Sequence, residues 1–169
     1  MDDRPPTVLV VEDETDVRDL WGRALRPLGL QVLEASGVAQ ALRALKREAV
    51  DILVLDWVLG DDTGEIVMDS WVGNGGGPLC VVSGVVGLEG LTPLLSKGAY
   101  NVLTKPVATE TIVAVVGRYV TWVRVLRELR IMRIELAKMR RLVIVAVTIA
   151  VASRAIPLDV LAEALGSLM

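Results

Sequence analysis

The sequence predicts a doubly wound α/β domain followed by a helical extension. Five short apolar runs alternate with amphipathic stretches over roughly the first 120 of the 169 residues. Hydrophobic residues make up 53% of the chain, which contains no Phe, so we expect a core of Val, Leu, Ile and Ala. Successive β-α units joined by right-handed crossovers place helices on both faces of a parallel sheet. We therefore expect one domain over residues 1–120 and a helical extension over residues 121–169.

The third apolar run, residues 51–56, is expected to lie at the centre of this sheet. Its four consecutive aliphatic residues are too few for a helix of ordinary length and favour a strand buried on both faces. The other expected strands are similarly short and apolar. They span residues 8–11, 31–35, 79–83 and 100–103.

Helical stretches separate these runs. Pro27 and Gly29 are expected to close the first helix, and apolar residues repeat on one face of the second. A glycine-rich loop at residues 73–78 separates the third helix from the fourth strand. The expected helices span residues 15–28, 38–47, 63–72 and 88–97, and a fifth begins near Thr109.

Polar side chains follow four of the five expected strands. Glu12 and Asp13 end the first strand, Asp56 ends the third, Ser83 ends the fourth, and Lys105 lies just beyond the fifth. A flavodoxin-like strand order of two-one-three-four-five makes the first and third strands neighbours, roughly 5 Å apart. The three acids then converge on the crevice outside the carboxyl ends of the strands, where such sheets bind their ligands.

Three neighbouring carboxylates require a compensating positive charge. Removing ionised carboxylates from water is costly, and like charges at one site repel each other. Hard oxygen ligands at a partly open site suit Mg²⁺. Lys105 lies about two strand spacings, roughly 10 Å, from the third strand, and its long side chain can cover much of that gap. Taken singly, each residue has an ordinary structural interpretation as a helix cap, a turn former or a surface charge.

Composition excludes several kinds of chemistry. The chain contains no histidine, which rules out a phosphohistidine, a Ser-His-Asp triad or a histidine-ligated zinc site on this chain. Its single cysteine, Cys80, lies in an apolar run and is expected to be a core residue in a reducing compartment. The acidic, proline-bearing N-terminus is unlike a secretory signal, so we expect a cytoplasmic location.

Five short motifs of the chain resemble those of the receiver domain of bacterial two-component response regulators. They occur in family order and at family-like spacing over roughly residues 7–120. Each motif is weak by itself, and the five in register make the resemblance specific. The motifs are Val10-Val11-Glu12-Asp13-Glu14, Val54-Leu55-Asp56, Val82-Ser83-Gly84, Gly98-Ala99 and Thr104-Lys105-Pro106.

The resemblance implies that Asp56 accepts a phosphoryl group from the phosphohistidine of a partner kinase or phosphotransfer protein. It also implies that Ser83 and Lys105 bind the phosphoryl oxygens and that the Lys105-Pro106 peptide bond is cis. These roles agree with the chemistry, because a carboxylate is already deprotonated near neutrality and needs no base to act as a nucleophile. Phosphoryl transfer mainly requires positioning and neutralisation of charge.

The resemblance further implies a set of metal ligands. Glu12 and Asp13 are expected to hold Mg²⁺ together with Asp56 and the backbone carbonyl of Val58. On this basis the chain is not an enzyme but a phosphoacceptor switch, whose only reactions are self-phosphorylation from a phosphodonor and autodephosphorylation.

Three positions depart from the family pattern. The family carries an aromatic residue three positions before the lysine, and its change of rotamer is part of the usual switch. Val102 stands at that position here, so this chain lacks the aromatic residue of the switch. Tyr100 shares a strand face with Val102 and is a candidate substitute. Val58 and Val85, which flank the phosphorylation site in the family, are both apolar. We expect slow autodephosphorylation.

A heptad pattern continues through the start of the extension. Apolar residues alternate by three and four, the spacing of a and d positions in a coiled coil. In that register Glu128 and Glu135 fall at g and Arg133 and Arg140 at e, the relation that joins two parallel helices. We expect a homodimer through residues 109–146. The stripe consists of Trp122, Val125, Leu129, Met132, Leu136, Met139, Val143 and Ala146.

The composition of the tail leaves other interpretations open. Between Arg118 and Arg141, eight basic residues stand against two acidic ones, which is compatible with nucleic-acid binding. Aromatic residues are sparse there and the arginines are spread around the helix, which favours a solvated face. Docking of the tail onto its own receiver domain is a further alternative.

A charge-free apolar stretch follows at residues 142–153. It falls short of the ~18 to 20 residues that span a bilayer, and Arg154 and Asp159 interrupt its extension, so we expect burial in the dimer and no membrane span. Pro157 marks a turn. Residues 159–168 are expected to form a short amphipathic helix that folds back and closes a four-helix dimer end.

Two classes of function follow from this sequence. The favoured one is a response regulator of a two-component phosphorelay that signals to a downstream protein through a dimeric helical tail, without enzymatic or DNA-binding output. The alternative is a transcriptional or antitermination regulator whose short basic tail binds nucleic acid. A small phosphatase with an aspartyl nucleophile is a more distant third, because it would need a second acid two residues after Asp56, where Val58 stands.

Overall fold

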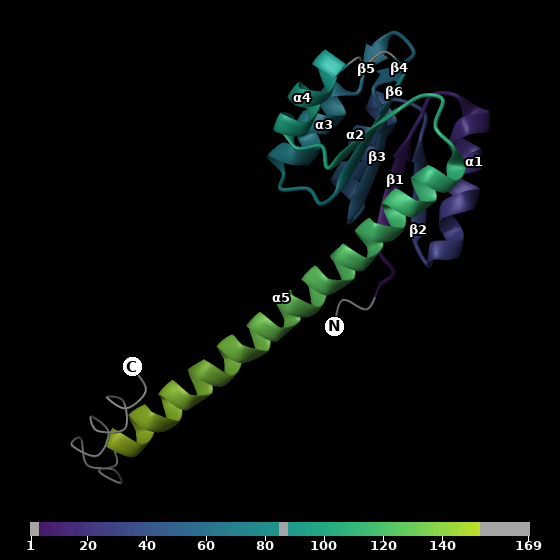
Figure 1. Ribbon diagram of the computed structural model, residues 1–169. Helices are drawn as coiled ribbons and strands as arrows, with labels where there is room; N and C mark the ends of the chain where they lie inside the picture. The colour runs from purple at the N-terminus through teal and green to yellow at the C-terminus, as the bar shows by residue number, and fades with distance from the viewer. Residues whose placement is uncertain (1–3, 85–87, 153–169) are drawn as a thin grey trace. The chain divides into compact units, whose positions relative to one another are not determined.

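A five-stranded parallel sheet forms the centre of the domain in the computed structural model, which describes residues 4–84 and 88–152 (Figure 1). The strand order is β2-β1-β3-β6-β7, the two-one-three-four-five order of the predicted flavodoxin-like fold, which is thereby confirmed. All pairs within the sheet are parallel. The strands are β1 (Thr7–Val11), β2 (Gln31–Ala35), β3 (Ile52–Asp56), β6 (Leu79–Ser83) and β7 (Asn101–Thr104).

Helices cover both faces of this sheet. The bounds of the second and fourth helices agree with those predicted from the sequence, and the fifth begins at Thr109 as expected. The helices are α1 (Thr15–Leu25), the 3-10 turn η1 (Arg26–Leu28), α2 (Val38–Arg47), α3 (Glu65–Gly73), α4 (Leu88–Lys97) and α5 (Thr109–Ala152).

The alternation of side chains along the buried strands produces two cores, one on each face of the sheet. Val8 and Val10 of β1 pack in one cluster with apolar residues of α1 and the first part of α5. Leu9 and Val11, which point to the opposite face, pack in the other cluster with residues of α2, α3 and α4. Cys80 is buried in the first cluster, as expected, and burial raises the pKa of its thiol to about 12.

The predicted third helix begins too early, because an antiparallel hairpin occupies its first residues. β4 (Val58–Leu59) pairs with β5 (Asp62–Thr63), so Thr63 belongs to a strand and α3 begins at Glu65. Gly60 adopts a φ of 66° within the turn, a conformation that glycine tolerates without strain. The hairpin begins two residues after Asp56 and therefore lies beside the acidic crevice.

Other boundaries differ from prediction by one to three residues. The first helix ends at Leu25 and continues as the 3-10 turn η1, since Pro27 has no N–H to donate to the preceding turn. Gly29 follows in a left-handed conformation, with a φ of 71°. The last strand begins one residue later than expected, at Asn101.

Helix α5 extends well beyond the core that it helps to form. Its last buried side chain is Val123. The structure divides into one compact unit over residues 2–126 and a second one from residue 127 onward. Side chains of the second unit are exposed at every position from residue 128 to residue 146. The terminal helix predicted at residues 159–168 lies outside the described residues.

Among the helices of the described part of the chain, none is long and apolar enough to cross a membrane.

Candidate functional site

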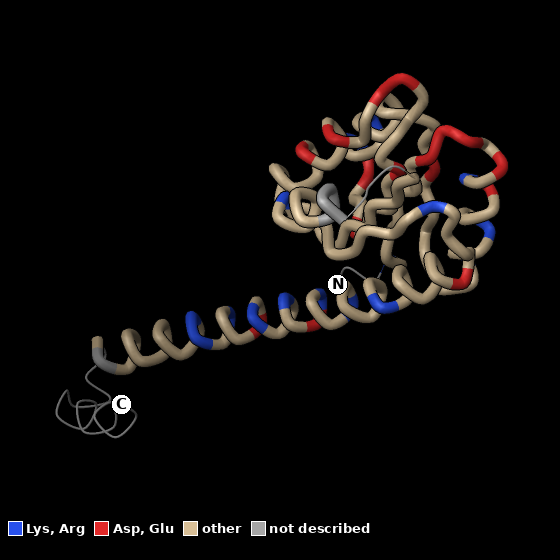
Figure 2. Tube along the Cα trace, turned by 45° about the horizontal axis from the view of Figure 1, so that its top comes forward, with Lys and Arg blue, Asp and Glu red and all other residues tan. Residues whose placement is uncertain are grey.

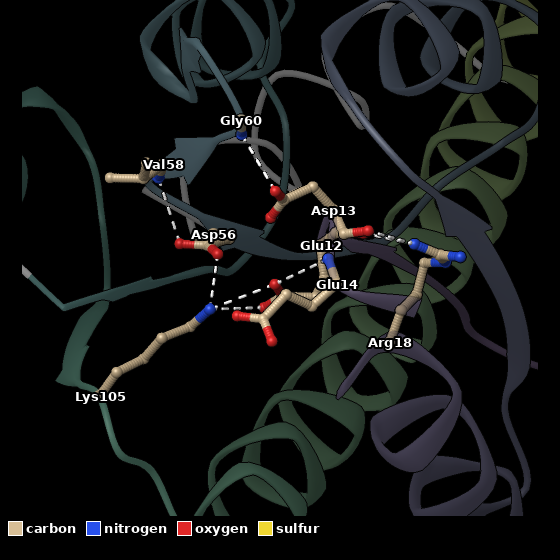
Figure 3. Close-up of polar contacts among 8 residues, drawn as sticks. All are labelled: Glu12, Asp13, Glu14, Arg18, Asp56, Val58, Gly60 and Lys105. Carbon is tan, nitrogen blue, oxygen red and sulfur yellow. Dashed lines mark hydrogen bonds and ion pairs between the residues drawn. The ribbon is translucent and has the colours of Figure 1, made fainter. Parts of the chain in front are cut away.

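Three acidic side chains meet at the carboxyl edge of the sheet (Figure 3). Glu12 and Asp13 follow β1, and Asp56 ends β3, which pairs with β1 in parallel. One carboxylate oxygen from each residue lies within 4.8 Å of the other two. Glu12 and Asp56 are buried whereas Asp13 is exposed, so the cluster is open to solvent on one side.

Lys105 reaches this cluster from the edge strand of the sheet. It follows β7, which is separated from β3 by β6. Its Nζ lies 2.6 Å from Asp56 Oδ2 and 2.9 Å from Glu12 Oε2, and donates a longer hydrogen bond of 3.2 Å to Glu12 Oε1. The same ammonium lies 5.9 Å from the ring centroid of the buried Trp21, within the range of a cation–π interaction.

Burial and charge alter the protonation of two of these groups. Desolvation by burial raises the pKa of Glu12 to about 7, an effect that the hydrogen bond from Lys105 opposes and the charge of Asp56 reinforces. Burial alone would lower the pKa of Lys105, but its hydrogen bonds to Asp56 and Glu12 and their negative charges raise it overall. The ionisation of Glu12 thus depends on what neutralises the cluster.

Backbone amides of the β4–β5 hairpin orient two of the carboxylates. The Val58 N–H donates to Asp56 Oδ1 over 3.1 Å, and the Gly60 N–H donates to Asp13 Oδ2 over 3.1 Å. Both contacts are visible in Figure 3. The hairpin thereby connects the ends of β1 and β3 and holds the carboxylates toward one another.

Arg18 stabilises the acidic loop from helix α1, a contact that sequence reasoning missed. Its Nη1 donates to the backbone carbonyls of Glu12, over 2.7 Å, and of Asp13, over 3.2 Å, while Nη2 donates to Thr15 Oγ1 over 3.2 Å. The signal in the sequence was a basic residue near the start of the first helix, five positions after the acidic pair. Arg18 therefore fixes the backbone that carries both acids rather than their side chains.

Ser83 is buried at the carboxyl end of β6. Its backbone carbonyl accepts a hydrogen bond of 2.8 Å from the Lys105 N–H, which places the start of the lysine loop beside the end of β6. The Lys105-Pro106 peptide bond is cis, as the resemblance implied. Val85 lies outside the described residues.

Val102, at the position where the family carries an aromatic residue, and Tyr100, its candidate substitute, lie in different environments. Val102 is partly buried against the core formed with α3 and α4. Tyr100, the candidate substitute, is 51% exposed and packs edge-on against Trp122 of α5 with a centroid distance of 4.7 Å. Tyr100 also lies 6.4 Å from the ring of Tyr119. Whether Tyr100 acts as a switch stays a prediction.

The donor set of the cluster fits a divalent cation with hard oxygen ligands. Three carboxylates offer oxygens within 4.8 Å of one another, and the exposed Asp13 leaves room for water or a further ligand. Burial of the Glu12 carboxyl adds to the requirement for positive charge, because an ionised carboxylate out of water is costly.

The flavodoxin-like domain carries two acids after β1, an acid at the end of β3 and a lysine after β7. The model of the response regulator receiver domain matches residues 8–117, and the chain belongs to this family. Receiver domains are phosphoacceptor switches.

Curated relatives are bacterial response regulators. The probable transcriptional regulatory protein TcrX of Mycobacterium tuberculosis is 32% identical over 113 residues, which cover 66% of this chain and 48% of TcrX. The transcriptional regulatory protein PrrA of the same species is 34% identical over 115 residues, covering 64% of this chain and 47% of PrrA. The response regulator PilR of Pseudomonas aeruginosa is 31% identical over 100 residues, with 59% and 22% covered. The chain spans about half the length of TcrX and PrrA and a smaller part of PilR.

Solved structures show the same fold. The signal receiver domain of a putative Luxo repressor protein from Vibrio parahaemolyticus matches with a TM-score of 0.69 at 21% identity, covering 74% of this chain and 97% of that one. NtrX from Brucella abortus matches with a TM-score of 0.65 at 26% identity, covering 75% and 29%. These likenesses agree with the sheet order and the helix placement described above.

Proposed function

We propose that this protein is a cytoplasmic response regulator that accepts a phosphoryl group on Asp56 from a histidine kinase or a phosphotransfer protein. The observation that carries the proposal is the position of the Lys105 ammonium, 2.6 Å from Asp56 Oδ2 and next to two further acids. A carboxylate with one oxygen near a fixed cation and the other held by the Val58 amide is oriented for attack on phosphorus.

The transfer step needs no proton from Asp56. One carboxylate oxygen forms the new bond to phosphorus, while the bond between phosphorus and the donor atom breaks and the donor leaves with that electron pair. Lys105 neutralises charge on the phosphoryl oxygens. Ser83, at the end of the adjacent strand, is proposed to donate a hydrogen bond to the same oxygens.

The acidic cluster is proposed to hold Mg²⁺ through Glu12, Asp13 and Asp56 together with the backbone carbonyl of Val58. A divalent cation bound there supplies positive charge for the phosphoryl group as it approaches three carboxylates. Arg18 keeps the backbone of the acid pair in place, and the hairpin amides orient Asp13 and Asp56.

We further propose that the tail transmits the signal as a parallel homodimer. The side chains of the heptad stripe from residue 125 to residue 143 are between 45% and 64% exposed in the single chain, so a second helix is needed to cover them. Glu128 and Glu135 at g complement Arg133 and Arg140 at e of the second chain. The output in this proposal is a protein contact presented by the dimer.

Labelling with acetyl phosphate in the presence of Mg²⁺ tests the function. The wild-type chain is expected to gain the mass of one phosphoryl group in an intact-mass measurement, and Asp56→Asn to gain none, since an amide is not a nucleophile toward phosphorus. Asp62→Asn, which changes an exposed acid of the neighbouring hairpin, is the matched control and should label normally. An unlabelled wild-type chain, or equal labelling of Asp56→Asn, would refute the assignment.

A second candidate function is supported by the basic character of the tail and by the names of TcrX and PrrA, which are transcriptional regulators. The sequence beyond Trp122 contains no aromatic residue for stacking on bases. A salt-dependent mobility shift of duplex DNA on adding the chain would favour this alternative over a protein-only output.

A further inference from the structure

The last described part of α5 is apolar on every side. Residues 142–152, here called the apolar end, contain no charged residue, and seven of the eleven are Val, Ile or Thr. β-Branched residues lower helix propensity in water, so this composition is unusual for an exposed helix. The exposed fractions are 68% for Leu142, 61% for Val143, 54% for Ile144, 54% for Val145 and 61% for Ile149.

A two-stranded coiled coil cannot cover this segment. Continuing the heptad register puts Val143 at a, Ala146 at d and Ala150 at a, so the seam would bury two alanines. The larger Ile144 and Val145 fall at b and c, on the side that faces away from a partner helix. A helix that is apolar all round is stable only inside a protein core or in lipid. The heptad seam of the proposed dimer by itself therefore leaves most of this segment uncovered.

Basic residues precede the apolar end. Figure 2 shows them recurring along the middle of α5, and within the described part of the chain they stop at Arg141. Arg124 lies about 27 Å from Leu142 along the helix, whereas Lys138, Arg140 and Arg141 lie within about 6 Å of it. We call these last three residues the basic collar.

The apolar end has a basic residue near each boundary in the sequence, since Arg141 precedes it and Arg154 follows it. Its eleven helical residues, about 16 Å long at 1.5 Å each, can lie at the boundary between headgroups and lipid tails without carrying either charge into the hydrocarbon core. Long basic side chains at the boundary can place their stems along lipid tails and their charges among headgroups. Anionic headgroups on the cytoplasmic leaflet attract a basic cluster next to the surface.

We propose that the apolar end of α5 binds at the headgroup boundary of one leaflet of an anionic membrane, with its side chains among the lipid tails, while the basic collar binds the lipid headgroups. The inference uses neither Asp56 nor the metal cluster and stands without the phosphoacceptor assignment. It is compatible with the parallel dimer, because parallel helices present both apolar ends at the same end of the coiled coil. In this arrangement the membrane covers what the dimer seam leaves exposed.

Vesicle flotation of the full chain tests the proposal, with vesicles of phosphatidylcholine alone or mixed with phosphatidylglycerol. The wild-type chain should float with the anionic vesicles, remain unbound with the neutral ones, and lose binding as salt rises. The double variant Ile144→Asp/Val145→Asp should lose binding to anionic vesicles. Neither position belongs to the heptad seam, so its dimer mass in analytical ultracentrifugation should not change.

A charge variant isolates the collar. Lys138→Gln/Arg141→Gln alters positions c and f and should weaken binding to anionic vesicles by about thirtyfold, since each basic residue near the surface contributes a factor of about five. Leu129→Asp/Leu136→Asp, which disrupts the seam, should still bind the vesicles, although more weakly through the loss of the second anchor. Urea unfolding of each variant, followed by Trp fluorescence, confirms that its receiver domain is folded.

Three outcomes would overturn the proposal. One is absence of the wild-type chain from the anionic fraction, and another is equal binding to neutral and anionic vesicles. The third is an assembly larger than a dimer that falls to a dimer in Ile144→Asp/Val145→Asp without vesicle binding, which would mean that further copies of the chain cover the apolar end.

Discussion

Among single residues, Glu12 combines full burial with a position next to Asp56 and Lys105. In the metal-free protein its folded pKa of about 7 exceeds the ordinary value of 4.5, so the folded state binds this proton more tightly than the unfolded chain does. The stabilising contribution of Glu12 is therefore complete below pH 4.5 and is lost as the pH rises toward about 7. A cation in the cluster reverses this trend, because it favours the ionised carboxylate.

We predict that the affinity for Mg²⁺ falls as the pH drops below about 7. At pH 6 most of the Glu12 carboxyl is protonated, so the affinity should be about tenfold weaker than at pH 8. Fluorescence of Trp57, which follows Asp56 directly, provides the titration signal. Glu12→Gln should bind Mg²⁺ weakly with little dependence on pH between 6 and 8. An unchanged pH dependence in that variant would assign the proton to another group.

A second residue-level prediction concerns Gly64. A Cβ at this position would lie 2.7 Å from the backbone carbonyl oxygen of Asp56 and 3.1 Å from Leu55 Cγ, so Gly64→Ala must displace the strand end that carries the phosphoacceptor. We expect a loss of about 1–3 kcal/mol in the free energy of unfolding, as for other overpacked sites. Gly73→Ala is the matched control, because a Cβ there meets nothing within 4 Å.

Urea unfolding of both glycine variants checks this prediction. Gly73→Ala should leave the unfolding midpoint unchanged or raise it slightly, since alanine favours a helix over glycine. Acetyl phosphate should label Gly64→Ala more slowly than Gly73→Ala. Equal midpoints and equal labelling would mean that the backbone near Asp56 moves to accommodate the added Cβ without loss of stability.

At the level of elements, α5 has two different environments along one continuous helix. Its residues up to Val123 contribute to a core, and Tyr119 anchors this part by donating a hydrogen bond of 2.7 Å to Asn101 Oδ1. Beyond Leu126 the helix belongs to the second compact unit.

We predict that charged substitutions within the heptad stripe separate the dimer. Leu129→Asp/Leu136→Asp should sediment as a monomer, since two charges would be buried at successive a positions. Ile131→Asp/Ile134→Asp changes exposed apolar residues at c and f and should remain dimeric. Analytical ultracentrifugation measures both masses. If the first pair stays dimeric, or if both pairs dissociate alike, the heptad register is wrong.

For the whole molecule, the two compact units make different contributions. Both core clusters and the acidic site are composed of residues between Val8 and Val123. We predict that a chain ending after Leu126 folds, accepts phosphoryl label on Asp56 and is monomeric, because everything that the label requires precedes the tail. Intact-mass labelling and ultracentrifugation check this. A truncated chain that is unfolded or still dimeric would show that the tail unit supports the receiver unit.

Sequence reasoning predicted the strands because each is a short, isolated apolar run, and buried parallel strands carry that signal in the sequence itself. The strand order came from the flavodoxin-like fold that the alternation of strands and helices indicated. The short hairpin from Val58 to Thr63 escaped prediction, since strands of two residues have no periodicity to detect. The contact of Arg18 with the backbone of Glu12 and Asp13 was equally hidden, because an arginine in the first turns of a helix usually signals only a solvated surface.

The sequence by itself determined the fold class, the identity of the acids and the lysine, and the exclusion of histidine chemistry, because these depend on local pattern and composition. Only the tertiary structure decided that one ammonium reaches two buried carboxylates from a strand two places away. Such a contact depends on how strands pack side by side and on which groups lose their water, and neither is encoded in the spacing of residues along the chain.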